Sequence, residues 1–372
     1  MTITILTYYL GDVTSGQARF ANVLASGLYQ IGEDVSVLSS WATQSSLALL
    51  RSQGIEAATV HVGSPSELRK EFDIMYPKRA LVELRDQLTL RERRDWVIVL
   101  SDELVAASSF LPPMLKTAYI CQGDFMLLFL SDPFYRDSKL MKTVAATMAA
   151  HRIRQHARMV KAYDLLLSNS RFTRDFISYF YGCRIDDVCY PPVDLDFFKP
   201  RGAKSKERHI LCMSRNKREQ GVEFLEDLAR HVPLKIVGKT RVNGAETLGR
   251  LSDDQLICAY SEASAVLSPV ISEFFGYSIA ESLATGTPVI AYSGCGPAEL
   301  IQNGLNGWTA VREGDLISLA ERVVNLGYDE QMSARARESV RHLAPREVAF
   351  KLKGLLESAP IRRSKPSNGG GG

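Results

Sequence analysis

Two glutamates, Glu273 and Glu281, lie in the stretch SPVISEFFGYSIAESLATGTPVIAYSGCGPAEL, residues 268–300, with the pair Phe275-Gly276 between them. A helix that begins at Gly276 would expose its first backbone N–H groups, which have no intrahelical acceptors and carry the positive end of the helix dipole. The N-terminal end of a helix can therefore bind a phosphate. A carboxylate one turn further on can accept hydrogen bonds from the vicinal hydroxyls of a ribose, and a carboxylate before the helix can hold sugar hydroxyls. The stretch therefore predicts a cradle for a sugar nucleotide.

A plainer interpretation uses only local helix chemistry. In it, Glu281 is a solvated helix residue and Glu273 is an acid that the helix dipole favours. Taken alone, the two glutamates favour this plainer interpretation. The choice between it and a sugar-nucleotide site therefore depends on the elements around them.

The elements that would position the glutamates can be read from the same stretch. Ala265–Pro269 predicts a strand, and Val270–Phe274 is the loop at its carboxyl end. Gly276–Thr285 can form a helix, with Gly286 as the residue that stops it. Glu273 would then lie in the loop and Glu281 about one turn inside the helix.

Short strands alternate with helical patterns along almost the whole chain. The strands predicted in the first half are Thr2–Tyr8, Asp34–Leu38, Trp96–Leu100, Thr117–Cys121 and Asp164–Ser168. Those predicted in the second half are His209–Met213, Leu234–Val237, Ala265–Ser268, Pro288–Tyr292 and Gly307–Val311. The main helices are expected over Gly16–Gly32, Leu47–Gly54, Lys139–Tyr163, from Ser170 onwards, and over Pro345–Ser358. This alternation is typical of α/β domains with parallel sheets and helices on both faces.

The alternation breaks once, near the middle of the chain. Tyr190-Pro191-Pro192-Val193-Asp194 favours extended backbone, and the basic polar stretch Lys199–Arg208 resembles a linker. We therefore expect a Rossmann-like domain over 1–196, a second one over 203–340, a C-terminal helix over 341–358 and a disordered tail over 359–372. Two doubly wound domains of this kind bind ligands at the carboxyl ends of their strands, in a cleft between them.

Composition narrows the class of protein. Hydrophobic residues make up 45% of the 372 residues and charged residues 23%, with a net charge of +3, which is typical of a soluble globular protein and gives no general reason to bind nucleic acid. The six cysteines are scattered without Cys-x-x-Cys spacing, so no structural zinc site is expected. The sequence has neither a signal-peptide pattern nor an apolar run long enough to span a bilayer. These features predict a cytoplasmic protein, with peripheral contact at the inner membrane face as a further possibility.

Taken together, the motifs resemble those of the retaining glycosyltransferases of the GT-B fold, and more narrowly those of the GT4 family, the glycosyl transferases group 1. The resemblance is strong over about 165–312 and weaker over 1–165. The residues that carry it are Glu273-Phe-Phe-Gly-Tyr-Ser-Ile-Ala-Glu281, Ala284–Ile290, Gly294–Glu299, Asn303–Gly307, Gly249–Ser252, Val188–Asp194 and Ser168–Thr173. The resemblance implies two Rossmann-like domains facing a cleft, with the acceptor bound by the domain over 1–196 and the nucleotide-sugar donor by the domain over 203–340. It further implies that the C-terminal helix crosses back to the N-terminal domain.

The resemblance also implies roles for residues of the second domain. The family clamps the donor diphosphate with an Arg-x4-Lys pair, of which Arg215 matches the arginine, whereas the lysine position is Gln220 and Lys217 could supply charge from another angle. Glu273 would contact the donor sugar and Glu281 the ribose. The remaining donor-binding positions are Phe275, Gly276 and Tyr277, through backbone amides, and Arg250 and Leu251, against the nucleobase. Phe274 replaces a glycine that is usual in the family.

In the first domain, Ser15 and Gly16 match the family's glycine loop after the first strand, which the resemblance places near the acceptor and the diphosphate; an ordinary capped turn is the alternative. The family often has a histidine where this chain has Gln122, and Asp124 is the carboxylate near it. The resemblance therefore adds Gln122 and Asp124 to Glu273 and Arg215 as candidate catalytic residues. An ordinary turn aspartate is the alternative for Asp124.

The long helix 139–163 carries cations on more than one face, most of which we expect to be solvated. Some of them could attract an anionic acceptor, such as a lipid-linked phosphate at a membrane surface.

The resemblance leads to one reading of function. The chain is identified as a metal-independent hexosyltransferase that moves a sugar from a nucleoside diphosphate sugar to the hydroxyl of a glycan, lipid-linked or small-molecule acceptor, as in polysaccharide biosynthesis. No cofactor or nucleic-acid partner is expected. The alternatives are another GT-B reaction such as sugar-phosphate synthesis, a catalytically weak sugar-nucleotide-binding subunit of a partner transferase, and a Rossmann oxidoreductase. The last is disfavoured because Glu299 occupies the third glycine position after Gly294-x-Gly296.

Overall fold

The structure is a computed structural model of the chain. It describes residues 1–11, 16–66, 69, 73, 79, 81–84, 95–112, 115–123, 139–201, 208–213, 222–270, 273–327 and 329–360, without most side chains of 139–152. The predicted site residues Ser15, Asp124, Arg215, Lys217 and Gln220 lie outside the described residues.

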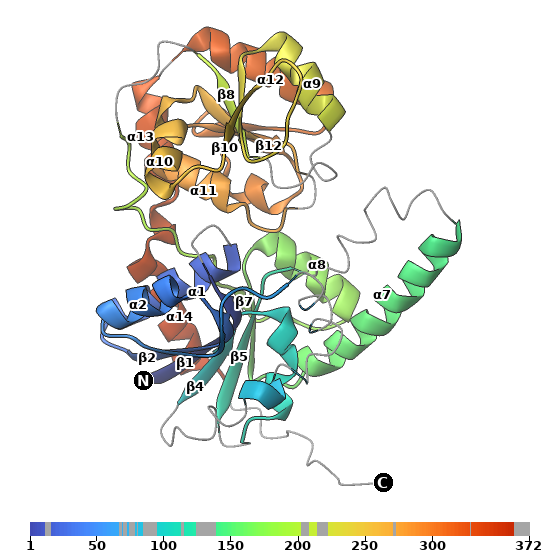
Figure 1. Ribbon diagram of the computed structural model, residues 1–372, viewed down its shortest axis with the longest axis vertical. Coiled ribbons are helices and arrows are strands. Elements are labelled where there is room, and N and C mark those ends of the chain that lie inside the picture. Colours follow the sequence, from blue (N-terminus) through green and yellow to red (C-terminus); the bar gives the residue numbers. More distant parts are fainter. Residues whose placement is uncertain are drawn as a thin grey trace. The chain divides into compact units, whose positions relative to one another are not determined.

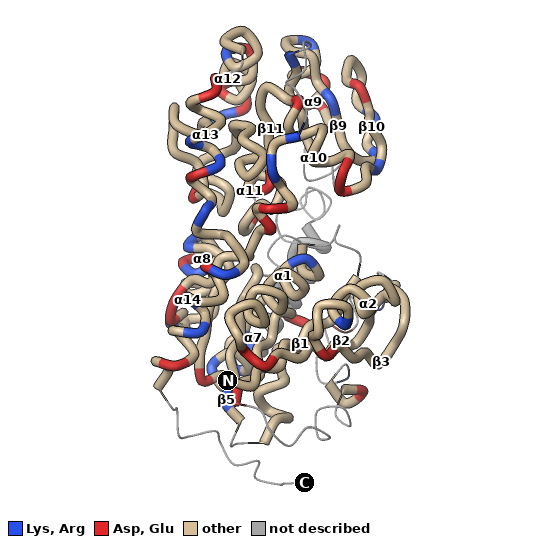
Figure 2. Tube along the Cα trace, turned by 90° about the vertical axis from the view of Figure 1, so that its left-hand side faces the viewer, with Lys and Arg blue, Asp and Glu red and all other residues tan. Residues whose placement is uncertain are grey.

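The chain forms two units, each built on one parallel sheet (Figure 1). The first unit takes the described residues of Met1–Leu127, Thr143–Pro192 and Pro345–Gly372, and the second takes those of Leu128–Lys142 and Val193–Ala344. Acidic and basic residues are interspersed along the trace of both units (Figure 2).

The first sheet has the strand order β3-β2-β1-β4-β5-β6-β7, and its strands pair in parallel. The strands are β1 (Thr2–Leu10), β2 (Asp34–Ala42), β3 (Glu56–Val62), β4 (Trp96–Val99), β5 (Lys116–Cys121), β6 (Leu165–Ser168) and β7 (Asp187–Val188). The helices are α1 (Gly16–Gln30), α2 (Gln44–Ser52), η1 (Asp102–Ser109), α7 (Lys139–Val160), α8 (Arg171–Tyr181) and α14 (Pro345–Ser358). The order reverses between β1 and β4, which is where doubly wound sheets bind ligands.

The C-terminal helix α14 packs on the first unit, as the resemblance implied. A Cβ atom on Gly27 of α1 would lie 2.4 Å from the Pro345 carbonyl oxygen, so the two helices touch backbone to backbone. Lys351 Nζ donates to the Val188 carbonyl at 2.7 Å, and Lys353 forms an ion pair with the buried Glu33.

The second sheet repeats the topology of the first, with the order β10-β9-β8-β11-β12-β13. The strands are β8 (Ile210–Met213), β9 (Leu234–Val237), β10 (Glu246–Gly249), β11 (Ala265–Ser268), β12 (Val289–Tyr292) and β13 (Gly307–Ala310). The helices are α9 (Val222–His231), α10 (Asp253–Glu262), α11 (Tyr277–Ala284), η2 (Gly296–Leu300), α12 (Glu313–Leu326), α13 (Glu330–Ser339) and η3 (Arg341–Leu343). The order reverses between β8 and β11.

The predicted α/β fold is confirmed, and the sequence-based assignment missed some of its elements. It missed β3, β7, β10 and the 3-10 helix η1. β3 and β10 are edge strands that carry charged or polar residues and are only partly buried, so their apolar alternation is weak. Among the described residues, no helix is both long and apolar enough to cross a membrane.

Candidate functional site

The Glu273–Glu281 stretch folds as predicted around a left-handed glycine. Gly276 has φ 85° and ψ 72° and precedes α11, and Gly286 stops the helix beyond Thr285 with φ 74°. A side chain at Gly276 would be strained by this backbone conformation, and its Cβ would also lie 2.7 Å from Cγ of Pro297. The left-handed turn and the close contact therefore both require glycine at this position.

The turn Gly294-Cys295-Gly296 packs against the loop that precedes α11 and holds it in place. The backbone N–H of Gly296 donates to the Glu273 carbonyl at 2.9 Å. A Cβ at Gly296 would lie 1.9 Å from the carbonyl oxygen of Phe274, so the two backbones touch. Because α11 follows β11, which pairs with β8, the start of α11 lies at the carboxyl edge beside the point of strand-order reversal.

Cys295, between the two glycines, is buried and its thiol contacts the Tyr292 carbonyl oxygen at 3.1 Å. Burial, with the nearby charges of Glu273 and Glu299, raises the pKa of this thiol to about 11. The thiol is therefore protonated at neutral pH and belongs to the wall of the site.

Glu281 is not a solvated helix residue, so the plainer interpretation of this glutamate is wrong. Its side chain lies within the fold at 2% exposure, and Oε2 accepts a 3.0 Å hydrogen bond from the hydroxyl of Tyr260 on α10. Glu273 is half-buried at the start of the loop. The rings of Phe275 and Tyr277 meet edge to face, with centroids 5.3 Å apart, and both are buried.

The other predicted donor-side residues lie at the end of β10. Gly249 is left-handed with φ 72°, and its carbonyl accepts a 2.8 Å bond from the Gly238 N–H. Arg250 is exposed and Leu251 half-buried, and the next residue, Ser252, caps α10 in a capping box with Gln255.

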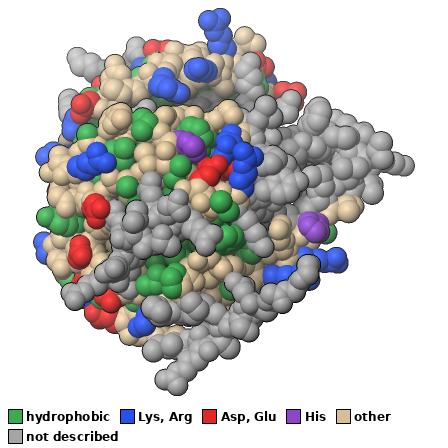
Figure 3. All heavy atoms as spheres, turned by 60° about the horizontal axis from the view of Figure 1, so that its bottom comes forward, with side chains coloured by type: hydrophobic (Ala, Val, Ile, Leu, Met, Phe, Trp, Pro, Cys, Tyr) green, Lys and Arg blue, Asp and Glu red, His purple; other side chains and the backbone are tan. Residues whose placement is uncertain are grey.

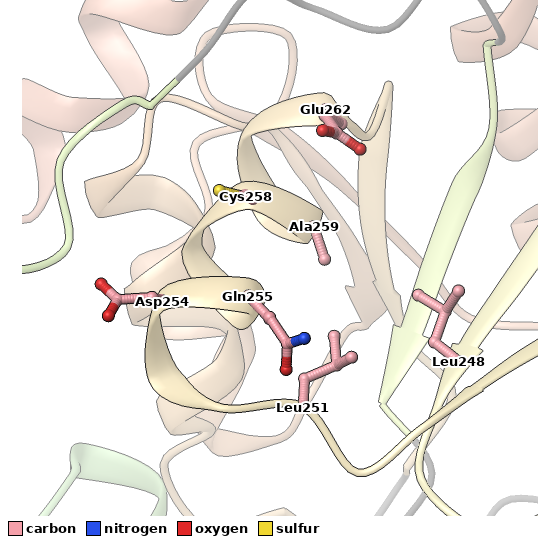
Figure 4. A pocket seen from close by; sticks show the side chains of 7 residues that line it. All are labelled: Leu248, Leu251, Asp254, Gln255, Cys258, Ala259 and Glu262. Carbon is pink, nitrogen blue, oxygen red and sulfur yellow. The ribbon is translucent and has the colours of Figure 1, made fainter.

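Leu251 lines a shallow open depression of about 350 Å³ along α10. Figure 4 shows Leu251, Gln255 and Ala259 pointing into the space that faces Leu248. The remaining lining residues are Asp254, Cys258 and Glu262. Neither Glu273 nor Glu281 lines this depression, so it is separate from the glutamate stretch.

In the first unit, Gly16 begins α1, and Gln122 follows the end of β5. The Gln122 side-chain amide donates to the Leu100 carbonyl, and the backbone carbonyl of Gln122 accepts a 3.1 Å hydrogen bond from the Asn169 side-chain amide. These bonds hold Gln122 where β4, β5 and β6 end. Within the described residues, no three His, Cys, Asp or Glu side chains gather closely enough to hold a metal ion.

A polar and aromatic cluster at the carboxyl edge of β1–β3 was not predicted from the sequence. Arg69 donates through Nε to Asp73 at 2.7 Å and through one Nη to both oxygens of Glu83, at 2.9 and 3.1 Å. The Tyr8 hydroxyl donates to Asp73 at 2.7 Å, and His61 contacts Glu83 at 3.0 Å. Hydrogen bonding to Asp73 raises the pKa of Arg69, while burial and the same Asp73 raise the pKa of Tyr8.

The C-terminal part of helix α7 carries both exposed and buried basic side chains. Arg154, Arg158 and Lys161 are exposed, Lys161 just beyond the helix end. His156 is buried, unlike Arg154 and Arg158, and stacks on Tyr181 of α8 at 5.1 Å between ring centroids. The stretch Arg91–Arg94 lies outside the described residues.

Comparison with known protein families finds a match in the second unit. Residues 194–343 match the model of the family described as "Glycosyl transferases group 1". The match includes the left-handed turn at Gly276, both glutamates and the Gly-Cys-Gly turn. Residues 194–343 therefore form a glycosyl transferases group 1 domain.

Two curated relatives of this chain are glycosyltransferases of mycobacteria. D-inositol 3-phosphate glycosyltransferase of Mycolicibacterium smegmatis is 27% identical over 203 residues, which cover 46% of each chain. MMP alpha-(1->4)-mannosyltransferase of Mycolicibacterium hassiacum is 23% identical over 342 residues, 78% of this chain and 80% of the relative. The chain thus matches about half the length of the first relative and most of the second.

Solved structures confirm the fold of this chain. Sucrose-phosphate synthase of Thermosynechococcus elongatus superposes with a TM-score of 0.72 at 15% identity, over 96% of this chain and 98% of that one. Anabaena HepE, solved in complex with UDP and glucose, superposes with a TM-score of 0.70 at 14% identity, over 96% and 100%. Both likenesses support the predicted fold, in which each of the two units is Rossmann-like.

Proposed function

We propose that this chain transfers a sugar from a nucleoside diphosphate sugar to an acceptor hydroxyl, with retention of anomeric configuration and without a metal ion. The observation that carries the proposal is the left-handed turn at Gly276. It starts α11 at the carboxyl edge of the second sheet, with Glu273 before the helix and the buried Glu281 one turn inside it. The complex of HepE with UDP and glucose supports a nucleoside diphosphate donor.

Each part of this candidate binding site matches one part of a nucleoside diphosphate sugar. The first amides of α11, with the positive end of the helix dipole, suit the diphosphate, and Arg215 can fork onto the same oxygens. The Glu281 carboxylate, oriented by Tyr260, suits the ribose hydroxyls, and Glu273 suits the hydroxyls of the sugar.

The proposed reaction takes place on one face of the sugar. The bond between the anomeric carbon and the phosphate oxygen breaks, and its electron pair stays on that oxygen. The acceptor oxygen forms the new bond from the same side, and its proton passes to the departing phosphate oxygen. The protein contributes positioning and stabilises the negative charge that develops on the diphosphate.

Metal independence rests on protein cations taking the place of a metal at the diphosphate. The chain has an Asp-x-Asp sequence at Asp194-Leu-Asp196, a pattern that could suggest a metal site. Asp194 Oδ1 instead accepts the backbone N–H groups of Asp196 and Phe197 at 3.1 and 2.9 Å, so this carboxylate caps a turn. We expect EDTA to leave turnover unchanged.

For the acceptor side, we propose that the first unit docks on an anionic membrane surface that carries a lipid-linked acceptor. Helices α7 and α8 support this proposal because exposed Arg154, Arg158 and Lys161 accompany the exposed aromatic residues Tyr179 (82%) and Phe180 (39%). On the face in Figure 3, hydrophobic side chains form small groups among charged ones. Basic and aromatic side chains together suit reversible contact with an anionic membrane surface. Sedimentation with phosphatidylglycerol vesicles, but not with phosphatidylcholine vesicles, is the expected result.

The deciding experiment measures release of nucleoside diphosphate from UDP-, GDP-, ADP- and dTDP-hexoses by the purified chain. We expect slow hydrolysis of one donor, reduced about 100-fold in Arg215→Ala and in Glu273→Gln. Glu281→Gln should mainly raise the donor KM, and Glu330→Gln, which changes an exposed glutamate of α13, serves as the matched control. NMR of the glycoside product would show the same anomer as the donor, and the opposite anomer would overturn retention.

Donor binding without release, even with acceptor-rich cell extract added, would instead identify a sugar-nucleotide-binding subunit. In that case Gln220→Lys is the informative variant, because it restores the second cation of the family's Arg-x4-Lys pair.

A further inference from the structure

Three aromatic side chains form a row at the carboxyl edge of the first sheet. In the parallel register, Tyr9 of β1 pairs with Trp41 of β2, and Trp41 pairs with His61 of β3, so the three side chains lie on the same face of the sheet. The Trp41 and His61 rings have centroids 4.4 Å apart with 32° between their planes. All three are partly exposed, and the His61 side chain is 37% exposed. We call Tyr9, Trp41 and His61 the aromatic row.

Polar groups border this row on the side of the segment after β3. The Tyr9 hydroxyl shares a 2.7 Å hydrogen bond with Ser64 Oγ, and His61 Nε2 lies 3.0 Å from Glu83. The Arg69 guanidinium carbon lies 6.0 Å from the centre of the Trp41 ring. Hydroxyls, a carboxylate and a guanidinium therefore border the partly exposed side chains of the aromatic row.

The described cluster has one more acidic side chain than basic side chains. The single guanidinium of Arg69 is shared between Asp73, which is fully buried, and Glu83, whose side chain is 27% exposed. Because two carboxylates face one guanidinium, the cluster offers no surplus positive charge to a phosphate or carboxylate ligand. It suits a ligand that is rich in hydroxyls and carries no charge.

The aromatic row adjoins the loop that follows β1. A Cβ on Gly11 would lie 1.9 to 2.1 Å from atoms of the Tyr9 phenol, so the Tyr9 ring folds over the backbone of Gly11. Ser46 of α2 donates to the Gly11 carbonyl at 2.6 Å and fixes the entrance of this loop. The row therefore lies where a ligand at the strand ends of a doubly wound sheet would be found.

We propose that the aromatic row and its polar border form the subsite that receives an uncharged sugar ring of the acceptor. A sugar ring presents an apolar C–H face, which packs on aromatic faces, and equatorial hydroxyls, which reach Ser64, Glu83 and Arg69 at the rim. This assignment rests on the proposed transferase function and adds the chemical class of its acceptor. A purely structural cluster would need Tyr8, Asp73 and Arg69, which tie the segment after β3 to the sheet, but not the partial exposure of Trp41 and His61.

The test is direct binding of sugars to the full-length chain by saturation-transfer difference NMR, without any donor. The probes are the methyl α-glycosides of glucose, mannose and galactose, with glucose 6-phosphate and mannose 6-phosphate beside them. We expect ring-proton signals from at least one uncharged glycoside, weaker signals from the phosphates, and loss of the glycoside signal in Trp41→Ala. Trp41→Phe, which keeps an aromatic face, should retain part of the signal and covers the case in which Trp41→Ala fails to fold.

Val62→Ala is the matched control, because Val62 is the neighbouring residue on β3, is 59% exposed and points to the opposite face of the sheet. A glycoside signal that survives in folded Trp41→Ala overturns the proposal. So does the absence of any glycoside signal from the wild-type chain, or stronger binding of the sugar phosphates.

Turnover gives the second readout. With the donor and acceptor that the wild-type chain uses, Trp41→Ala should raise the acceptor KM about tenfold or more, while the donor KM and acceptor-independent donor hydrolysis stay unchanged. A chain that binds glycosides through Trp41 but hydrolyses no donor would refute the transferase function and leave the sugar subsite standing. Donor hydrolysis with an unaltered acceptor KM in Trp41→Ala would refute the subsite alone.

Discussion

The hydroxyl of Tyr260 on α10 donates a 3.0 Å hydrogen bond to Oε2 of Glu281 on α11, and both side chains are buried. A buried carboxylate is costly unless it accepts hydrogen bonds, so this tyrosine both stabilises Glu281 and sets the direction of the carboxylate.

Tyr260→Phe removes this hydrogen bond and leaves the rest of the ring in place. We expect the free energy of unfolding to fall by about 1–3 kcal/mol, because a buried acceptor loses its partner. Donor affinity should fall too, since the Glu281 carboxylate loses its fixed orientation. Urea denaturation and calorimetric titration with the donor nucleotide measure the two effects, with Tyr179→Phe, at a residue 82% exposed, as control. Unchanged nucleotide affinity in Tyr260→Phe would argue against Glu281 as the ribose ligand.

Gly276→Ala places a side chain where the backbone is left-handed and where Pro297 lies in contact distance. The expected loss of stability is about 1–3 kcal/mol, and donor affinity should drop at least about tenfold because the start of α11 must shift. Gly354→Ala is the control, since Gly354 lies within helix α14 and has open space around it. That variant should be neutral or stabilising by up to about 1 kcal/mol. Equal behaviour of the two variants would contradict the role assigned to the Gly276 turn.

Arg337 of α13 ties the end of α11 to the segment that enters the second unit. Its guanidinium donates to the carbonyls of Ala284, Phe198 and Leu195 at 2.6, 3.2 and 3.0 Å. Arg337→Lys cannot reproduce this planar three-way contact, so we expect a loss of about 2–3 kcal/mol in thermal or urea unfolding. Arg341→Lys, at an exposed ion pair with Glu338, should change stability very little. A small effect in both variants would show that water replaces the Arg337 contacts.

Buried thiols should make the protein less stable at alkaline pH. Burial raises the pKa of Cys212 to about 12 from its ordinary value of 9.0, so the folded chain holds this proton more tightly than the unfolded chain. The stabilising effect is fully present below pH 9 and is lost as pH rises toward 12, with a slope of up to about 1.4 kcal/mol per pH unit for one group. Urea midpoints at pH 8, 9, 10 and 11 would fall less steeply in Cys212→Ala than in the wild type. Parallel curves would show that other groups cause the alkaline loss.

The part of the second unit that we propose binds the donor could be predicted well, because its sequence signals are local. The helix start at Gly276, the stop at Gly286 and the Gly-Cys-Gly turn depend on residues close together in the sequence, and all three are found as expected. The Tyr260–Glu281 hydrogen bond could not be predicted. It joins the helix that precedes β11 in the chain to the helix that follows it, and it depends on how each helix is rotated about its axis.

The aromatic row was missed for a related reason. Tyr9, Trp41 and His61 become neighbours only through the register of three strands, and β3 itself was not predicted from its sequence, EAATVHV. Aromatic residues at strand ends can be recognised from sequence, but which of them lie side by side is decided by strand pairing.

The place of α14 has a consequence for the order in which the chain can fold during synthesis. One face of α1 is covered by α14, so the first unit cannot complete its packing until residues 345–358 have left the ribosome. The segment Val193–Ala344, by contrast, contains all six strands of the second sheet and emerges earlier. The C-terminal half of this protein therefore has the means to finish folding before the N-terminal half, the reverse of the usual order of synthesis.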